Sequence, residues 1–348
     1  MQNRWIFSIL ALGFLLLNLT VDVARAKQFK IATVTPEGSG WMQAMRRAAT
    51  EIKERTDGRV EIKFYTGGVM GNDKKVLRKI RIGQLQGGVF TANGLSDRYR
   101  DIVIYGLPLV FQSQDEVDYV RGKMDPILEE GLEAAGFVSF GFASGGFAKL
   151  MGNQPVSGLD DLRGRKVWVP EGDTISYEAM VALKLSPVVL PITDVLTGLQ
   201  TGLLEYIATP PVGAVVLQWY TKVKYVSTLP LSYTLALMAI DKHAFGSISG
   251  EDQAIVREVL TAVYEVFDKQ NLEDNLQAEE ALAANGLKFV DPQSELVPEW
   301  RKAAQEANEK MGQDGVFSTA LLDQLQSHLE EFRSGAGMKQ KHAASSGP

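Results

Sequence analysis

The chain has 348 residues, of which 45% are hydrophobic and 22% are charged, with 36 basic and 42 acidic side chains. The net charge of −6 leaves no basic excess that would attract nucleic acid. A chain of this length and hydrophobic content can form a large core, which we expect to be divided between two lobes. Such a core does not need disulfides for stability, which agrees with the absence of cysteine from the sequence.

The first 26 residues have the features of a secretory signal peptide. Arg4 precedes an apolar run that ends at Leu19, and Ala24 and Ala26 occupy the −3 and −1 positions of a cleavage site. We expect cleavage after Ala26 and export to the periplasm of a Gram-negative cell, which leaves a net charge of −7. The alternative, an uncleaved membrane anchor, is disfavoured because the run is shorter than the roughly 20 residues that span a bilayer.

Strand and helix patterns then alternate along the first third of the chain. Alternating or helical spacing of apolar residues distinguishes the two kinds of element, and glycine-rich turns separate them. This order predicts an α/β fold with mainly parallel strands. The expected elements are a strand over 29–35, a helix over 41–55, a strand carrying Val60, Ile62 and Phe64 on one face, a helix from Asp73 with Val76, Leu77, Ile80 and Ile82 inside, and a strand over 87–94.

The later part of the chain repeats this alternation before it becomes helical. A stretch without proline or glycine over 251–285 predicts one long helix, which could reach across both lobes. The other expected elements are a helix capped near Ser113, a further helix over 126–136, strands over 137–153, 166–170, 186–191 and 205–211, helices over 175–185 and 193–204, a returning strand over 233–245, and a helical segment over 298–333.

The residues that usually carry out catalysis do not form a recognisable pattern. The three histidines, His243, His328 and His342, are scattered along the chain, which supports neither a zinc cluster nor a histidine-based triad. Phosphate-loop, dinucleotide-binding, nucleophile-elbow and calcium-loop motifs are missing from the sequence. We therefore expect a binding protein with no catalytic residues, no metal and no cofactor, rather than an enzyme.

The order of several segments resembles the solute receptors of tripartite ATP-independent periplasmic (TRAP) transporters, of the dicarboxylate-receptor type. The segments are loose individually but specific together, and they cover nearly the whole mature chain. They are "FKIATVTPEGSGW", "EIKFYTGGVMGNDKKVLRKIRIGQLQGGVFT", "GLPLVFQSQDEV", "GLDDLRGRKVWVPEGD", "SPVVLPITDVLTGLQTGLLE" and the long helix after "SGEDQ".

The resemblance implies a two-lobe periplasmic binding protein fold with crossing strands and a long helix that spans both lobes. Such receptors close on a small organic ligand and deliver it to the TRAP membrane permease subunits. The expected division is a signal peptide over 1–26, lobe I over 27–145 and 236–265, lobe II over 146–235 and 266–333, and a disordered tail over 334–348.

The sequence departs from the family pattern at polar positions that bind the ligand. Trp168 stands where the family places an arginine before Val-Pro, and Ala148 replaces a second basic residue. Thr209 followed by two prolines replaces an asparagine, and the run 73–75 replaces an acid near the start of the second helix. Four polar positions have therefore lost or changed their charge.

An arginine at the Trp168 position would form two parallel hydrogen bonds to a carboxylate, whereas an indole donates one and carries no charge. Tryptophan instead offers ~150–250 Å² of buriable surface, and a buried carboxylate without a cation is costly. We therefore predict an apolar or aromatic ligand. The predicted ligand-binding residues are Trp168, Thr209, Asn93, Trp41, Thr91, Phe147, Pro210 and Phe111.

Three alternatives stay open at this point. Trp168 can belong to the lobe core while Arg98 or Lys149 acts as a relocated clamp for an organic acid, and Phe111 and Phe147 can be core residues. The protein can also be a stand-alone carrier or sensor of a hydrophobic ligand. A subgroup of the family that lacks the arginine is associated with a periplasmic tetratricopeptide-repeat protein, so the resemblance leaves such a partner open.

Overall fold

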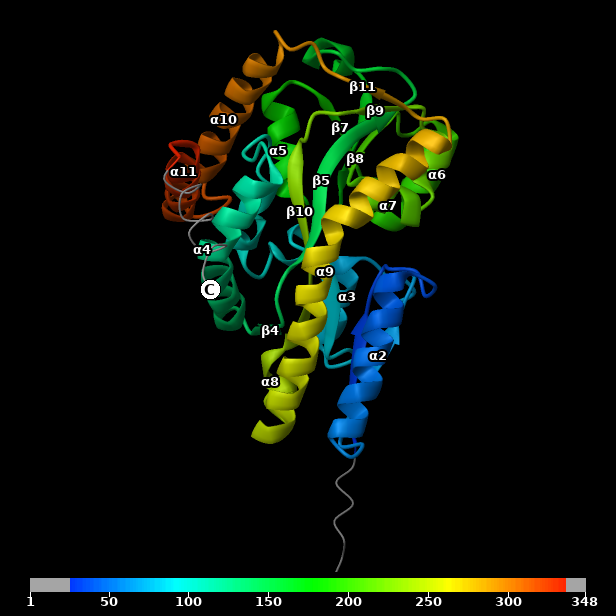
Figure 1. The fold of residues 1–348 in the computed structure, drawn as a ribbon, viewed down its shortest axis with the longest axis vertical. Helices are drawn as coiled ribbons and strands as arrows, with labels where there is room; N and C mark the ends of the chain where they lie inside the picture. Colours follow the sequence, from blue (N-terminus) through cyan, green and yellow to red (C-terminus); the bar gives the residue numbers. More distant parts are fainter. Residues whose placement is uncertain (1–25, 336–348) are drawn as a thin grey trace, which may run out of the picture.

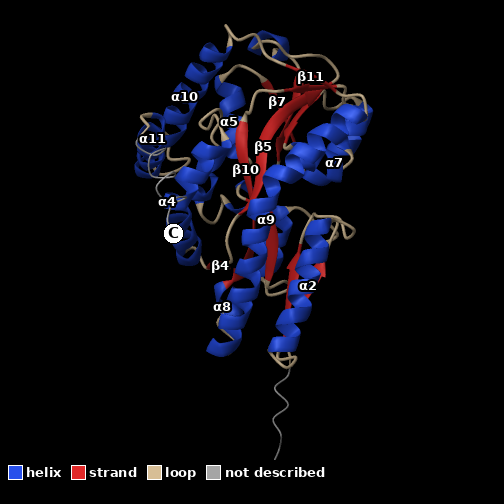
Figure 2. Cartoon of the chain, in the orientation of Figure 1, coloured by secondary structure: helices blue, strands red, loops and turns tan. Residues whose placement is uncertain are grey.

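Strands from both halves of the chain form one continuous sheet in the computed structural model, which describes residues 26–335 (Figures 1 and 2). The described strands are β1 (Lys27–Ala32), β2 (Val60–Tyr65), β3 (Gly87–Thr91), β4 (Phe137–Ser139), β5 (Ala143–Gly152), β6 (Lys166–Pro170), β7 (Ser186–Leu190), β8 (Tyr206–Thr209), β9 (Tyr225–Ser227), β10 (Ser232–Asp241) and β11 (Lys288–Val290). Their main order is β2-β1-β3-β10-β5-β8-β6-β7.

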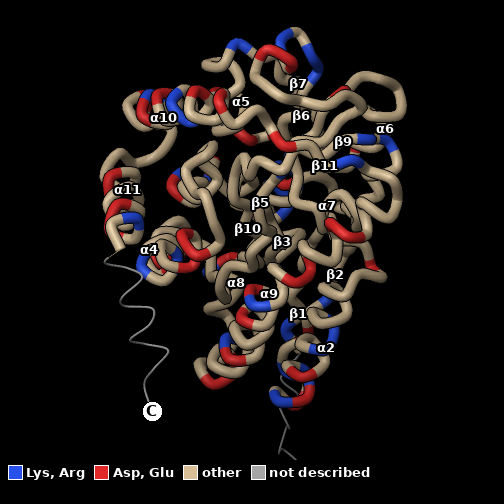
Figure 3. The backbone as a smooth tube through the Cα atoms, turned by 45° about the horizontal axis from the view of Figure 1, so that its top comes forward, with Lys and Arg blue, Asp and Glu red and all other residues tan. Residues whose placement is uncertain are grey.

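Helices cover the sheet and connect its parallel strands (Figure 1). The described helices are α2 (Gly40–Arg55), α3 (Asp73–Arg81), α4 (Gln114–Ala134), α5 (Thr174–Ala182), α6 (Val195–Thr201), α7 (Pro211–Val216), α8 (Lys242–Phe245), α9 (Gly250–Ala284), α10 (Val297–Gln313) and α11 (Thr319–Arg333). Acidic and basic residues occur together on the outer helices α2 and α10, whereas α4 is mainly acidic (Figure 3).

The strands at each end of the sheet form the central layer of one lobe. In lobe I, β1 pairs in parallel with β2 and β3, and in lobe II, β6 pairs in parallel with β7 and β8. Helix α2 shows how the sequence determines these layers. The Ser39 hydroxyl accepts a hydrogen bond from the backbone N–H of Met42 and so caps the start of the helix. The apolar face of the helix is buried against the sheet through Met42, Met45, Ala48 and Ile52. The α/β layering predicted from the sequence is confirmed.

The two lobes are joined by the antiparallel pair β5 and β10, which cross from one lobe to the other. The register of this pair shifts between Thr234 and Leu235, which is the mark of a β-bulge. The long helix α9 runs beside the crossing and reaches both cores: Leu260 and Tyr264 pack in lobe I, and Leu282 packs in lobe II (Figure 1). At ~1.5 Å per residue its length is roughly 50 Å, as the uninterrupted sequence predicted.

The structure corrects three local predictions. The helix capped at Ser113 continues to Ala134 with Pro126 inside it, so no separate helix begins there; Met124 and Leu128 are buried on either side, and their packing outweighs the lost backbone hydrogen bond. The C-terminal segment is two helices, α10 and α11, separated by a turn. Ile82, expected inside α3, is 59% exposed because the helix ends before it.

The lobe boundaries proposed above stay a prediction, and the signal peptide and most of the tail lie outside the described residues. Within residues 26–335, α11 packs in the same hydrophobic cluster as α4 and β10. No helix in this part of the chain is long and apolar enough to cross a membrane.

The contact between Gly146 of β5 and Asn275 of α9 provides a test of what stabilises the joint between the lobes, at the crossing of β5 and β10. Gly146 has a φ of 86°, and a Cβ added there would lie 2.6 Å from Nδ2 of Asn275, which donates to the Gly145 carbonyl and to Asn271 Oδ1. We expect Gly146→Ala to lower the free energy of unfolding by about 2–3 kcal/mol, measured by chemical denaturation. The matched control is Gly58→Ala, because Gly58 also has a positive φ, of 76°, but an open Cβ position; its cost should be about 1 kcal/mol. Equal losses would show that Asn275 does not brace the joint.

Candidate functional site

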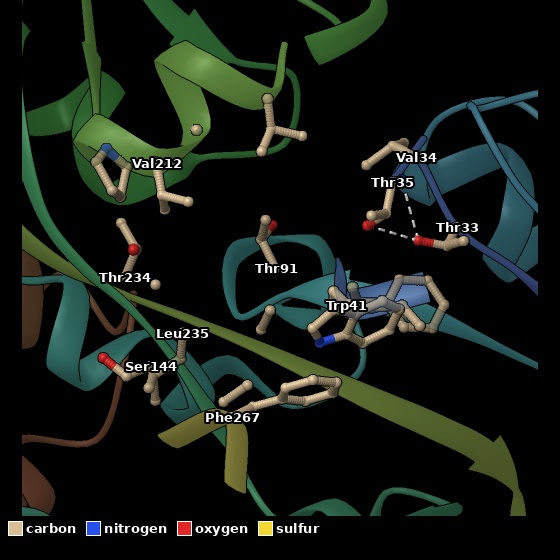
Figure 4. Close-up of a pocket in the computed structure, with 18 of the residues that line it drawn as sticks. Thr33, Val34, Thr35, Trp41, Thr91, Ser144, Val212, Thr234, Leu235 and Phe267 are labelled. Carbon is tan, nitrogen blue, oxygen red and sulfur yellow. Dashed lines mark hydrogen bonds between the residues drawn. The ribbon is translucent and has the colours of Figure 1, made fainter. Parts of the chain in front are cut away.

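A cavity of about 1270 Å³ lies between the two lobes, where the carboxyl ends of parallel strands from both lobes meet (Figure 4). In lobe I the cavity is lined by 33–35 after β1 and 91–94 at the end of β3. In lobe II it is lined by residues of 170–173 after β6 and of 208–210 at the end of β8. Ligands bind α/β sheets at these strand ends, because backbone N–H groups and loop side chains converge there.

Aromatic and small polar side chains line the cavity together. Trp41 on α2 stacks on Phe267 of α9 with ring centroids 5.3 Å apart, and Figure 4 shows the two rings on one side of the cavity. Ser144, Thr234 and Leu235 from the crossing strands lie on another side of it. The cavity therefore offers a flat apolar surface beside several hydroxyl groups.

Trp168 belongs to the core of lobe II and also borders the cavity. Its side chain is 4% exposed, and its ring packs edge-on against Trp219 with centroids 5.1 Å apart. The indole N–H donates to the backbone carbonyl of Leu190 at 3.0 Å. The only donor of this side chain is thus used inside the lobe, and what faces the cavity is apolar ring surface.

The structure brings six of the eight predicted ligand-binding residues to this cavity and leaves two outside it. The six are Trp41, Thr91, Asn93, Trp168, Thr209 and Pro210. Phe147 does not line it because neighbouring side chains of a strand point to opposite faces, and Ala148 is the one that faces the cavity. Phe111 is 2% exposed, and both phenyl rings pack against Tyr233, which lies between them and the cavity.

Neither basic residue considered as a relocated clamp reaches the cavity. Arg98 lies over the ring of Phe137, 5.6 Å from its centroid, and Lys149 pairs with Glu279 at 2.6 Å. Among residues 26–335, only Arg47 and Arg55 bring a positive charge to the lining. Arg55 is held by Glu258 at 2.7 Å and by Glu51 at 3.3 Å. No arginine therefore stands at the Trp168 end of the cavity.

Sequence reasoning missed three carboxylates that line the cavity at the seam between the lobes: Asp73, Glu171 and Asp173. Burial raises the pKa of Asp73 to about 7, against a smaller lowering by the Thr91 hydroxyl. Burial also raises the pKa of Asp173, although its carboxylate accepts hydrogen bonds from the Ser176 backbone N–H and hydroxyl and so caps α5. The sequence did contain a signal for these positions. Glu171 follows the strand β6, and Asp73 and Asp173 lie at the starts of helices α3 and α5.

The lobes touch each other at the edge of the cavity. The Asn72 amide donates to the Glu171 carboxylate, and the Asn93 side chain bonds to Asp173. A Cβ added at Gly68 would lie 2.9 Å from Cγ2 of Thr193 in the opposite lobe. These contacts show that the cavity is held between lobes that have come together.

Residues 31–314 match the family described as bacterial extracellular solute-binding protein, family 7 (DctP). The chain belongs to this family. It is 27% identical to the C4-dicarboxylate-binding periplasmic protein DctP of Rhodobacter capsulatus over 187 residues, which cover 52% of this chain and 54% of the relative. The match thus spans about half the length of that curated relative.

Two solved structures share the fold. The TRAP periplasmic solute-binding protein of Xanthobacter autotrophicus, solved with bound β-D-galacturonate, has a TM-score of 0.79 at 19% identity and covers 87% of this chain and 99% of its own. The sugar acid binding protein of Advenella mimigardefordensis, in complex with galactonate, has a TM-score of 0.81 at 16% identity and covers 88% and 98%. These structures confirm the expected two-lobe fold, and the family match confirms the expectation of a binding protein rather than an enzyme.

Replacement of Trp168 tests its structural role. We expect Trp168→Ala to lower the free energy of unfolding by about 3–5 kcal/mol, because the change opens a void against Trp219. Trp168→Phe keeps a ring and should cost only about 1–2 kcal/mol, since the Leu190 carbonyl still accepts from the Glu171 backbone N–H. Chemical denaturation of both variants provides the measurement. An alanine variant as stable as the parent would mean that Trp168 contributes only a cavity wall.

Asp73 should give the apo protein a measurable pH dependence. Its pKa of about 7 lies above its ordinary value of 3.8, so the folded state binds the proton more tightly than the unfolded state does. The contribution of Asp73 to the free energy of unfolding therefore rises as the pH falls from about 7 toward 4. Asp73→Asn removes this term, so the variant should gain stability over the parent at pH 8 and lose that advantage at pH 5. The neighbouring Lys74 and Lys75 and the cavity-lining Glu171 and Asp173 stay unchanged in both proteins. A difference between the two proteins that is identical at both pH values would contradict the shift.

Proposed function

We propose that this member of the family is the periplasmic solute receptor of a TRAP-type secondary transporter. It is exported, binds a small organic ligand in the cavity between its lobes and delivers it to the membrane permease subunits. The observation that supports this function is the cavity of about 1270 Å³ at the strand ends of both lobes. A ligand held there contacts both lobes at once, so its binding energy favours the closed form.

We propose further that the ligand has an apolar or aromatic body and does not depend on a carboxylate clamp. Trp41 and Phe267 supply a stacked aromatic surface, and the ring of Trp168 adds apolar wall at the lobe II end. A carboxylate placed beside Trp168 would lose its water without gaining a cation, which is unfavourable. Thr91, Asn93 and Thr209 remain as hydrogen-bonding groups that fix the orientation of the ligand.

A second candidate is a receptor for an organic acid, and one observation favours it. Arg47 lines the cavity on the α2 side and has no ion pair with any acid in residues 26–335. The solved relatives with bound galacturonate and galactonate add weight to this candidate. A tetratricopeptide-repeat partner remains a hypothesis. A role as a stand-alone carrier or sensor is a further hypothesis, and permease genes next to the gene of this protein would favour the transport role over it.

The solute that accompanies the native protein decides between the two candidates. Native mass spectrometry of protein gently isolated from the periplasm, followed by denaturation and identification of the released molecule, gives its mass and charge. We expect an organic molecule without a carboxylate and with an apolar body. A co-purified acid whose retention is lost in Arg47→Gln would favour the second candidate. Release of no small molecule, together with no binding from a panel of solutes, would contradict a receptor function.

Opening and closing of the lobes can be tested without knowing the ligand, because the chain has no cysteine of its own. The contact between Gly68 and Thr193 places the two Cβ positions within about 4.5 Å, a distance that a disulfide can bridge. We expect the double variant Gly68→Cys and Thr193→Cys to be more compact when oxidised than when reduced, as measured by small-angle X-ray scattering. Each single variant is the control for strain at Gly68. Identical scattering before and after reduction would mean that the lobes do not open.

A further inference from the structure

We infer that Asp73 is a specificity-determining residue of the cavity, and that it recognises a ligand carrying a protonated amine. This inference rests on the proposed function, because it assigns a chemical group to the ligand of the same cavity. The side chain comes from the first residue of α3, in lobe I, and it lines the cavity beside Thr91, Asn93 and Gly94.

The carboxylate of Asp73 has almost no partner inside the protein. Its Oδ2 accepts one hydrogen bond, from the Thr91 hydroxyl, at the long distance of 3.4 Å. No Lys or Arg in the described part of the chain forms an ion pair with it, and its neighbour Lys74 is directed toward the opposite lobe, with Cε 3.4 Å from the Cβ position of Gly172. A carboxylate oxygen accepts two hydrogen bonds, so several acceptor positions remain unused in the cavity.

The other two carboxylates of the seam are already engaged. Asp173 accepts from the Ser176 backbone N–H at 2.9 Å and from its hydroxyl at 2.6 Å, and it also bonds to Asn93. Glu171 accepts from the Asn72 amide across the lobes. Asp73 is thus the acid of this group that a ligand can approach.

The Asp73 carboxylate lies in a space that the neighbouring Gly94 leaves open. Gly94 has no side chain, and a Cβ built there would collide with Oδ2 of Asp73. The glycine therefore provides the space in which the carboxylate lies, next to the strand end that carries Thr91. A carboxylate with unused acceptor positions on the cavity side is well suited to a protonated amine, because the ion pair forms without breaking an existing one.

The charge of the whole lining agrees with this assignment. The positive charge of Arg55 is balanced by Glu51 and Glu258. Among residues 26–335, this leaves Arg47 as the unpaired cation of a lining that also carries Asp73, Glu171, Asp173 and Asp274. The raised pKa of Asp73, about 7, shows the cost of holding its charge without a partner, and an ammonium group would remove that cost.

Three probes with one aromatic body and different charges test the inference by isothermal titration calorimetry at pH 8: tryptamine, tryptophol and indole-3-acetate. We expect tryptamine to bind the parent protein most tightly. Asp73→Asn should weaken tryptamine binding roughly 10- to 100-fold and change tryptophol binding by less than about threefold. Gly94→Ala keeps the charge but fills the place of the carboxylate, and it should cause the same selective loss.

Asp274→Asn is the matched control, because Asp274 lies on an exposed part of α9 and also lines the cavity. It removes the same unit of charge and should leave tryptamine binding within about threefold of the parent. Equal losses in Asp73→Asn and Asp274→Asn would overturn the role of Asp73, since only the net charge would matter. Tightest binding of indole-3-acetate would overturn the inference and leave a receptor for acids. Failure of all three probes to bind would instead overturn the proposed aromatic ligand class, and the inference with it.

Discussion

The antiparallel pairing of β5 with β10 is the constraint on which the rest of the structure depends. These two strands belong to the sheets of both lobes, so they fix which ends of the parallel strands face each other. The bulge at Thr234 and Leu235 interrupts the ladder at the point where the lobes separate, and Asn271 and Asn275 of α9 bond to the strand backbone or side chains there. One continuous sheet can therefore bend at a defined place without losing either core. The cavity lies at this bend because the loops that close it grow from strands on both sides.

The repeating pattern of apolar residues made the fold predictable. Alternation in the strand segments, the uninterrupted stretch over 251–285 and the cap at Ser113 each indicated the observed element, because short-range spacing determines them. Pro126 was misleading for the same reason: local rules end a helix at proline, whereas burial of Met124 and Leu128 keeps it intact. The end of α3 before Ile82 also depends on where the tertiary packing stops. The local spacing of apolar residues therefore predicts the order of helices and strands. The exact ends of these elements depend on tertiary contacts, which cannot be read from local sequence.

The cavity was harder to predict than the fold, because it depends on which face of a strand a side chain occupies. Thr91, Asn93, Thr209 and Pro210 line the cavity since they lie at or follow the carboxyl ends of strands, and their role in ligand binding stays a prediction. Phe147 and Ala148 are adjacent on β5, and the strand register decides that Ala148 is the one that lines the cavity. Asp73 was visible only as part of a charged run at a helix start. Its place at the seam depends on contacts between residues about a hundred positions apart, because its neighbour Asn72 bonds to Glu171 of the opposite lobe.

The tryptophan at position 168 links the aromatic wall of the cavity to the acidic seam formed by Asp73, Glu171 and Asp173. An arginine there would balance the carboxylates of the seam through the low dielectric of a closed cavity, where charges interact over longer distances than in water. With Trp168 bonded to the Leu190 carbonyl, that balance is absent, and Asp73 keeps its charge at a cost. The cost is tolerable when the lobes are open and water reaches the acid. It rises as they close, so a ligand that supplies a positive group gains the most from closure, and a ligand that adds a negative charge opposes it. Under the proposed function, Trp168 thus bears both on which solute fits the cavity and on which solute favours closure of the lobes.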